Sequence, residues 1–190
     1  SATAKDIEDE GERMKFVNEQ MEQLSWFTDE TSYSLVDMTS NIGKFTSNGI
    51  KLDKAVTQME GISVWASLSG ASLSDASRAM YNLSQAMSSG QVKAIDWMSI
   101  ENANMATREF KEAAIEAAVQ LGTLKKTEKG YIDATGKAAD VTKDFRGSLA
   151  QGWFTDKVLS KTLNRFGAFT GKLKEFQDAF EIDTASEAIK

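Results

Sequence analysis

The 190-residue sequence contains no cysteine, no histidine and no proline. Without cysteine, the chain has no disulfide framework and no thiolate zinc site. Without histidine, it lacks the most common general base near neutral pH and the most common metal ligand, so it cannot by itself form a Ser-His-Asp or Cys-His site. We therefore expect no catalytic residue, no metal site and no cofactor, and we expect that the chain is not an enzyme.

Long apolar runs are also missing. No window of about 18 apolar residues occurs, so no transmembrane helix is expected. The acidic, polar start SATAKDIEDEGERMK does not resemble a signal peptide. Because the chain opens and closes within helical patterns, we interpret it as a segment of a longer protein, the alternative being a complete small protein. Its length suits one domain with or without a helical extension.

Negative charge is concentrated at the N-terminus. Residues 1–30 carry nine acids and three bases, whereas residues 31–190 carry nineteen of each, for a net charge of −6. No basic face is expected, which disfavours nucleic-acid binding. The N-terminal acids form either a solvated helix face or a contact for a basic partner.

Helix-favouring composition and apolar periodicity predict an all-α (mainly α) fold. Both ends carry heptad-like stripes typical of amphipathic helices that pack on a partner helix. These stripes are Ile7, Met14, Val17, Met21 and Leu24 at one end and Phe169, Leu173, Phe176 and Phe180 at the other. We predict an N-terminal amphipathic helix over 1–27, a helical domain over 28–167 and a C-terminal amphipathic helix over 168–190. The two end helices either pair or extend together as a stalk.

The middle of the chain is expected to form a compact bundle, with about six to eight helices in all. Thr28 is predicted to cap a helix over 29–46, and either Ser72 or Ser74 is predicted to cap a helix that runs to Ser89. Glycines are predicted to end the helix over 51–69, the helix to Ser89 and a later helix at about residue 121. Residues 93–100 form a short helix or turn. A small β-hairpin is expected near 123–134, turning at Glu128-Lys129-Gly130. Helix signals resume at Val141, and Thr155 caps a later helix.

Four tryptophans and their neighbours are the most informative apolar residues. Trp65 and Trp97 are assigned to the core. The adjacent pairs are Trp26-Phe27 and Trp153-Phe154. Neighbours on a helix point about 100° apart, so burying both rings of a pair requires packing partners on two sides of the helix. Each pair therefore packs in the core or at a helix end, or anchors another subunit, since aromatic residues dominate interface energetics. We name Trp26, Phe27, Trp153 and Phe154 as candidate partner-interface residues.

Four blocks of the sequence resemble the tape measure domain of bacteriophage and prophage tail tape measure proteins. These blocks are DMTSNIGKFTSNGIKLDKAV (37–56), MEGISVWASLSG (59–70), SRAMYNLSQAMSSGQVKAIDWMSIENANMATREFKEAAIEAAVQLGTL (77–124) and FRGSLAQGWFTDKVLSKTLNRF (145–166). They occur in the order found in that family. The resemblance covers roughly residues 25–170.

The resemblance implies a structural virion protein made in the bacterial host cytoplasm and located in the lumen of the tail tube. Its expected partners are tail tube, tail tip and tail assembly proteins and further copies of itself, with no specific nucleic acid and with membrane contact only on genome ejection. Such proteins determine tail length and scaffold tail-tube assembly. The alternatives are a membrane-active helical protein engaged in genome ejection, suggested by the uncharged windows 61–74 and 79–92, and a segment associated with a cell-wall hydrolase.

Overall fold

The computed structural model describes residues 9–30 and 35–165, and these residues are mainly helical, as predicted. The elements are, in chain order, α1 (Glu10–Glu30), α2 (Leu35–Ser47), α3 (Leu52–Leu68), α4 (Leu73–Ser89), α5 (Ala94–Asn102), α6 (Arg108–Leu121), β1 (Leu124–Thr127), β2 (Gly130–Asp133), β3 (Ala138–Ala139), α7 (Phe145–Ser148) and the 3-10 helix η2 (Leu149–Gln151). A further helical stretch covers residues 156–165.

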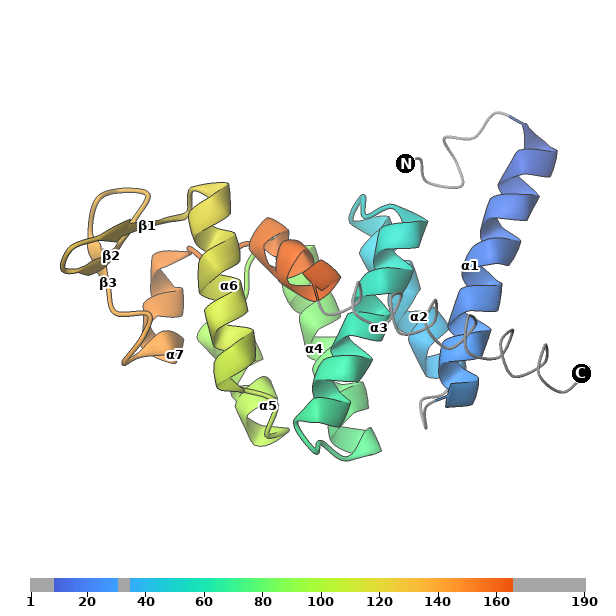
Figure 1. Ribbon diagram of the computed structural model, residues 1–190, viewed down its shortest axis with the longest axis horizontal. Helices are drawn as coiled ribbons and strands as arrows, with labels where there is room; N and C mark the ends of the chain where they lie inside the picture. The colour runs from blue at the N-terminus through green and yellow to red at the C-terminus, as the bar shows by residue number, and fades with distance from the viewer. Residues whose placement is uncertain (1–8, 31–34, 166–190) are drawn as a thin grey trace, which may run out of the picture.

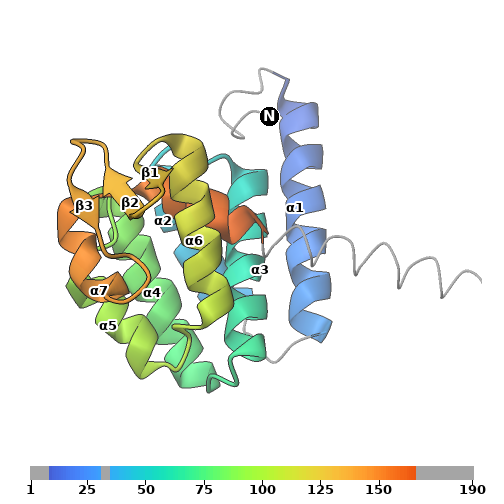
Figure 2. The ribbon, with the colours of Figure 1, turned by 60° about the vertical axis from the view of Figure 1, so that its left-hand side comes forward.

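The elements follow one another along the long axis of the molecule, with α1 at one end and the small sheet at the other (Figure 1). The chain then turns back, and helix 156–165 lies between α3 and α6 (Figures 1 and 2). The Gln58 amide of α3 donates to the Ser160 hydroxyl at 2.6 Å, and the Arg165 guanidinium is 2.8 Å from the Glu116 carboxylate of α6. The returning helix therefore ties the two halves of the described chain together.

Helix α3 is the centre of the bundle. It contacts α1, α2 and α4, and it is buried on nearly every side along most of its length. Small side chains make this possible, because Gly61, Ser63 and Ala66 let neighbouring backbones approach closely. The Ser63 hydroxyl donates to the Met59 carbonyl of its own helix at 3.1 Å, which satisfies a polar group without a partner on another element.

Several helix ends lie where the sequence predicts them. The Ser72 hydroxyl caps α4 by accepting from the Asp75 amide at 3.1 Å, and Gly90 ends that helix with a left-handed backbone at φ 87°. Gly122 ends α6 in the same way, at φ 81°. Thr155 caps helix 156–165 through the Val158 amide at 3.2 Å. Each of these signals is local, which is why the sequence alone reveals them.

The predicted boundary at Thr28 is wrong. Helix α1 continues through this residue to Glu30, rather than ending at residue 27 with a new helix capped by Thr28. Threonine caps a helix only where its backbone is extended, and no glycine or proline interrupts the hydrogen-bond ladder here. The C-terminal stripe from Phe169 to Phe180, and with it the predicted helix over 168–190, lies outside the described residues.

The predicted hairpin is present and gains a third strand. β1 and β2 pair antiparallel, and Gly130 follows the turn with φ 130°. β3 then pairs with β2 to give the order β1-β2-β3. The helix expected from Val141 is much shorter than predicted, because a single α-turn capped by Asp144 passes directly into η2.

Asp133 organises the loop that joins β2 to β3. Its carboxylate accepts from the Thr135 hydroxyl at 2.6 Å, from the Thr135 and Lys137 amides at 2.9 and 3.0 Å, and from the Gln151 amide group at 2.8 Å. These donors stabilise the ionised form, the Thr135 hydroxyl most, and lower the pKa of Asp133 to about 2. The aspartate thereby links the sheet to η2 and stays charged over the physiological range.

A cluster of stacked aromatic rings joins the helices on the sheet side of the molecule. Trp65 of α3 stacks on Phe110 of α6 with ring centroids 3.6 Å apart. Trp97 of α5 lies 5.9 Å from Phe110 and 4.6 Å from Phe145 of α7. Trp65 and Trp97 are only 1% and 2% exposed, so their predicted core role is confirmed. Tilted ring pairs such as Trp97 and Phe145 add stability beyond the area they bury.

Candidate functional site

Helix α1 exposes much of its apolar stripe. Met14 is 56% exposed and Met21 is 38% exposed, whereas Leu24, near the C-terminal end of the helix, is fully buried. Figure 1 shows α1 at the edge of the molecule, with α2 and α3 on one side only. Helix α1 is thus covered at Leu24, whereas the apolar side chains of Met14 and Met21 are open to another helix.

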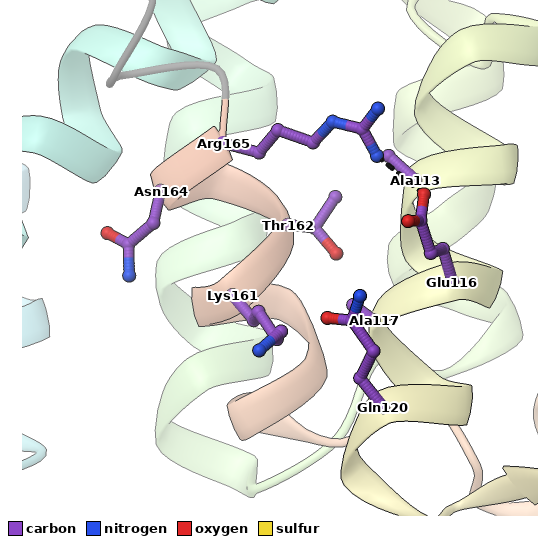
Figure 3. Close-up of a pocket in the computed structure, with 8 residues that line it drawn as sticks. All are labelled: Ala113, Glu116, Ala117, Gln120, Lys161, Thr162, Asn164 and Arg165. Atoms are coloured by element: carbon purple, nitrogen blue, oxygen red, sulfur yellow. Dashed lines mark hydrogen bonds and ion pairs between the residues drawn. The ribbon is translucent and has the colours of Figure 1, made fainter.

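A polar groove of about 360 Å³ lies between α6 and helix 156–165. Its floor contains the small residues Ala113 and Ala117, and the side chains of Glu116 and Arg165 meet across it (Figure 3). Both charged side chains are more than half exposed, so this ion pair contributes less than about 1 kcal/mol to stability. The Thr162 hydroxyl donates to the Val158 carbonyl of its own helix at 2.8 Å. These contacts join two helices, and they do not activate a nucleophile.

The candidate interface pair Trp153-Phe154 is buried within the chain. Each residue is 1% exposed, and the Trp153 indole donates to the Ser148 hydroxyl at 3.0 Å. Both rings pack against Phe145 at near-perpendicular angles. This arrangement is the core packing that the sequence left open as the alternative.

The other candidate pair, Trp26-Phe27, belongs to α1, and its side chains lie outside what the structure describes. A partner contact at any of these four residues stays a prediction.

Glu60 is a buried carboxyl group that the sequence analysis missed. It lies on α3 with 0% exposure, and the Gln23 amide group of α1 donates to its two oxygens at 3.0 and 3.2 Å. Burial raises its pKa to about 7, and the Gln23 hydrogen bond only partly opposes that increase. One signal was present: Glu60 is the single charged residue in the stretch 55–74. A lone acid in an otherwise uncharged helix indicates a buried ionisable group.

Within residues 9–30 and 35–165, no group of three or more acidic side chains is placed to hold a metal ion. No helix in these ranges combines the length and the apolar character needed to cross a bilayer.

The described fold defines a class of protein: a helical packing module with a central buried helix, a polar groove and an apolar helix face at one edge. A sequence model of the family described as "Tape measure protein" matches residues 7–184. The chain therefore belongs to the tape measure protein family, whose members are structural proteins of the phage tail. No curated protein and no solved structure matches the chain.

Proposed function

We propose that this chain is a module of a tail tape measure protein that sets tail length and scaffolds tail-tube assembly through helix–helix contacts in the tube lumen. The observation that supports this proposal is the exposed stripe on α1, with Met14 56% and Met21 38% exposed. An exposed heptad face is suited to pairing with another long helix. A helix also serves as a ruler, because it adds about 1.5 Å for each residue.

The charge pattern of α1 favours a second copy of the same chain as its helical partner. With Met14 and Met21 at heptad positions a and Val17 at position d, the flanking positions e and g decide whether two copies repel each other. These flanking positions are occupied by Arg13, Asn18, Gln20 and Ser25. The acids Glu12, Glu19 and Glu22 fall on the outer face. Two copies can therefore pair without bringing carboxylates face to face.

Tail length tests the ruler function. Inserting about 56 residues of ideal heptad sequence ahead of α1 in the parent protein is expected to lengthen the tail by about 84 Å, because each helical residue rises about 1.5 Å. Electron micrographs of tails from phage carrying the insertion provide the measurement. Tails of unchanged length, from particles that contain the longer protein, would show that this chain does not act as a ruler.

Self-association tests the role of the α1 stripe. Wild-type chain is expected to show a concentration-dependent increase in mass by light scattering after size exclusion, since burying Met14 and Met21 against a second helix removes apolar surface from water. The double substitution Met14→Glu and Met21→Glu places charges at the seam and is expected to abolish this increase. Ile95→Glu is the matched control, because Ile95 is 74% exposed on α5, away from the stripe. Equal association by the double variant and by wild type would exclude α1 as the interface.

A further inference from the structure

The contact between α1 and α3 contains a buried ionisable group. Glu60 of α3 is completely covered, and it accepts hydrogen bonds from Gln23, which comes from α1. Leu24, the next residue of α1, is also completely buried. Met14 and Met21 of the same helix are exposed. The described contact between α1 and α3 therefore includes a buried acid.

Ionisation of Glu60 opposes this contact. An ionised carboxylate loses its hydration when it is buried, and a single neutral amide does not replace that hydration. Separation of α1 from α3 would return the carboxylate to water. Exposing Glu60 to water thus removes the free-energy cost of burying its ionised carboxylate. Burying the neutral carboxyl group costs little free energy.

We propose that Glu60 is a proton-operated latch: with a neutral carboxyl group α1 stays docked on α3, and ionisation of Glu60 releases α1 from the bundle. Release would uncover Leu24 and extend the apolar stripe of α1 toward its C-terminal end. The latch would therefore control how much of α1 is available to another helix.

The direction and range of the pH dependence follow from the burial of Glu60. Its pKa is about 7 when α1 is docked and returns toward the ordinary 4.5 when the group is exposed. Docking is therefore fully favoured below about pH 4.5 and is progressively lost as the pH rises through 7. A difference of about 2.5 in pKa weakens the docking equilibrium by roughly 300-fold at high pH.

Other charged groups do not account for the behaviour of Glu60. Burial raises its pKa and the Gln23 amide lowers it, with no contribution from a charged side chain of the described residues. Such side chains on the elements packed against α3 include Glu19 and Glu22 on α1, Lys44 on α2, and Asp75 and Arg78 on α4. Helix 156–165 and α6 contact α3 at Gln58 and Trp65, which point about 140–160° away from Glu60 around the helix.

Distance measurements between two spin labels test the latch on the full chain. The chain has no cysteine, so Glu19→Cys on α1 and Gln85→Cys on α4 introduce labels at two exposed positions. Labelled protein is diluted with unlabelled protein so that only distances within one chain are recorded. We expect a single short distance at about pH 5 and a broad, longer distribution at about pH 8.5, with the transition between the undocked pKa of 4.5 and the docked pKa of about 7. The fluorescence of the buried tryptophans reports whether the rest of the bundle stays folded.

Substitutions make the test specific to Glu60. Glu60→Gln keeps the shape and removes the ionisation, and Glu60→Met replaces the carboxyl group with an apolar side chain; both are expected to keep the short distance at both pH values. The matched control Glu22→Gln removes an exposed acid next to Gln23 and should retain the wild-type transition. An unchanged distance in wild type across this pH range, or a wild-type transition in Glu60→Gln, would overturn the proposal.

Discussion

Replacing Phe110 with alanine is expected to lower the free energy of unfolding by about 3–5 kcal/mol. Phe110 is fully buried, and its ring stacks between Trp65 at 3.6 Å and Trp97 at 5.9 Å. The substitution removes the contact that joins α3 to α6 and leaves a cavity between two large rings that cannot move freely to fill it. Urea unfolding followed by circular dichroism measures this loss.

An exposed aromatic residue provides the control for Phe110. Tyr81 is 50% exposed on α4, with the Lys44 ammonium 3.9 Å from its ring centre, so Tyr81→Ala should cost less than about 1 kcal/mol. If Phe110→Ala does not fold, the milder Phe110→Leu is expected to cost about 1 kcal/mol. Similar losses for Phe110→Ala and Tyr81→Ala would show that the aromatic stack is not central to stability.

Glu60→Gln is expected to stabilise the chain at high pH by up to about 3 kcal/mol, while leaving stability at about pH 4.5 unchanged. In wild type, the pKa of about 7 in the folded state lies above the ordinary 4.5, so unfolding releases a proton between these values. The contribution of Glu60 to the free energy of unfolding therefore falls as the pH rises toward 7. Glutamine has nearly the same shape as the neutral acid and does not ionise.

The size of the Glu60→Gln effect also bears on how α1 behaves. If α1 separates before the rest of the bundle unfolds, the increase in the free energy of unfolding caused by Glu60→Gln cannot exceed the free energy with which α1 docks on α3. Urea unfolding of wild type and variant in parallel at several pH values gives the difference at each pH, which cancels the titration of all other carboxyl groups. A difference that does not vary with pH would mean that Glu60 stays in one protonation state.

Much of the fold was predictable because its signals are local. The capping hydroxyl of Ser72, the left-handed glycine Gly90 and the turn at Gly130 each depend on a few neighbouring residues. The extra strand β3 was missed because its two alanines carry no strand preference, and pairing with β2 alone defines it.

The candidate site was less predictable, since burial is a property of the whole bundle. The sequence pattern of Trp153 and Phe154 fits either a core or an interface, and only the packing of Phe145 against both rings distinguishes them. The burial of Glu60 likewise depends on the whole bundle. Its isolation among uncharged residues is visible in the sequence, but its contact with Gln23, 37 positions earlier, is not.

The sequence by itself determined the helical class, the hairpin, the absence of cysteine and histidine chemistry, and the resemblance to tape measure proteins, because each depends on composition or on short-range pattern. Only the tertiary structure decided that Leu24 of α1 is buried while Met14 and Met21 are exposed, that Glu60 is covered, and that helix 156–165 returns between α3 and α6. These features arise from contacts between residues far apart in the chain. Such contacts determine which side chains lose water, and hence which groups are neutral, charged or available to a partner.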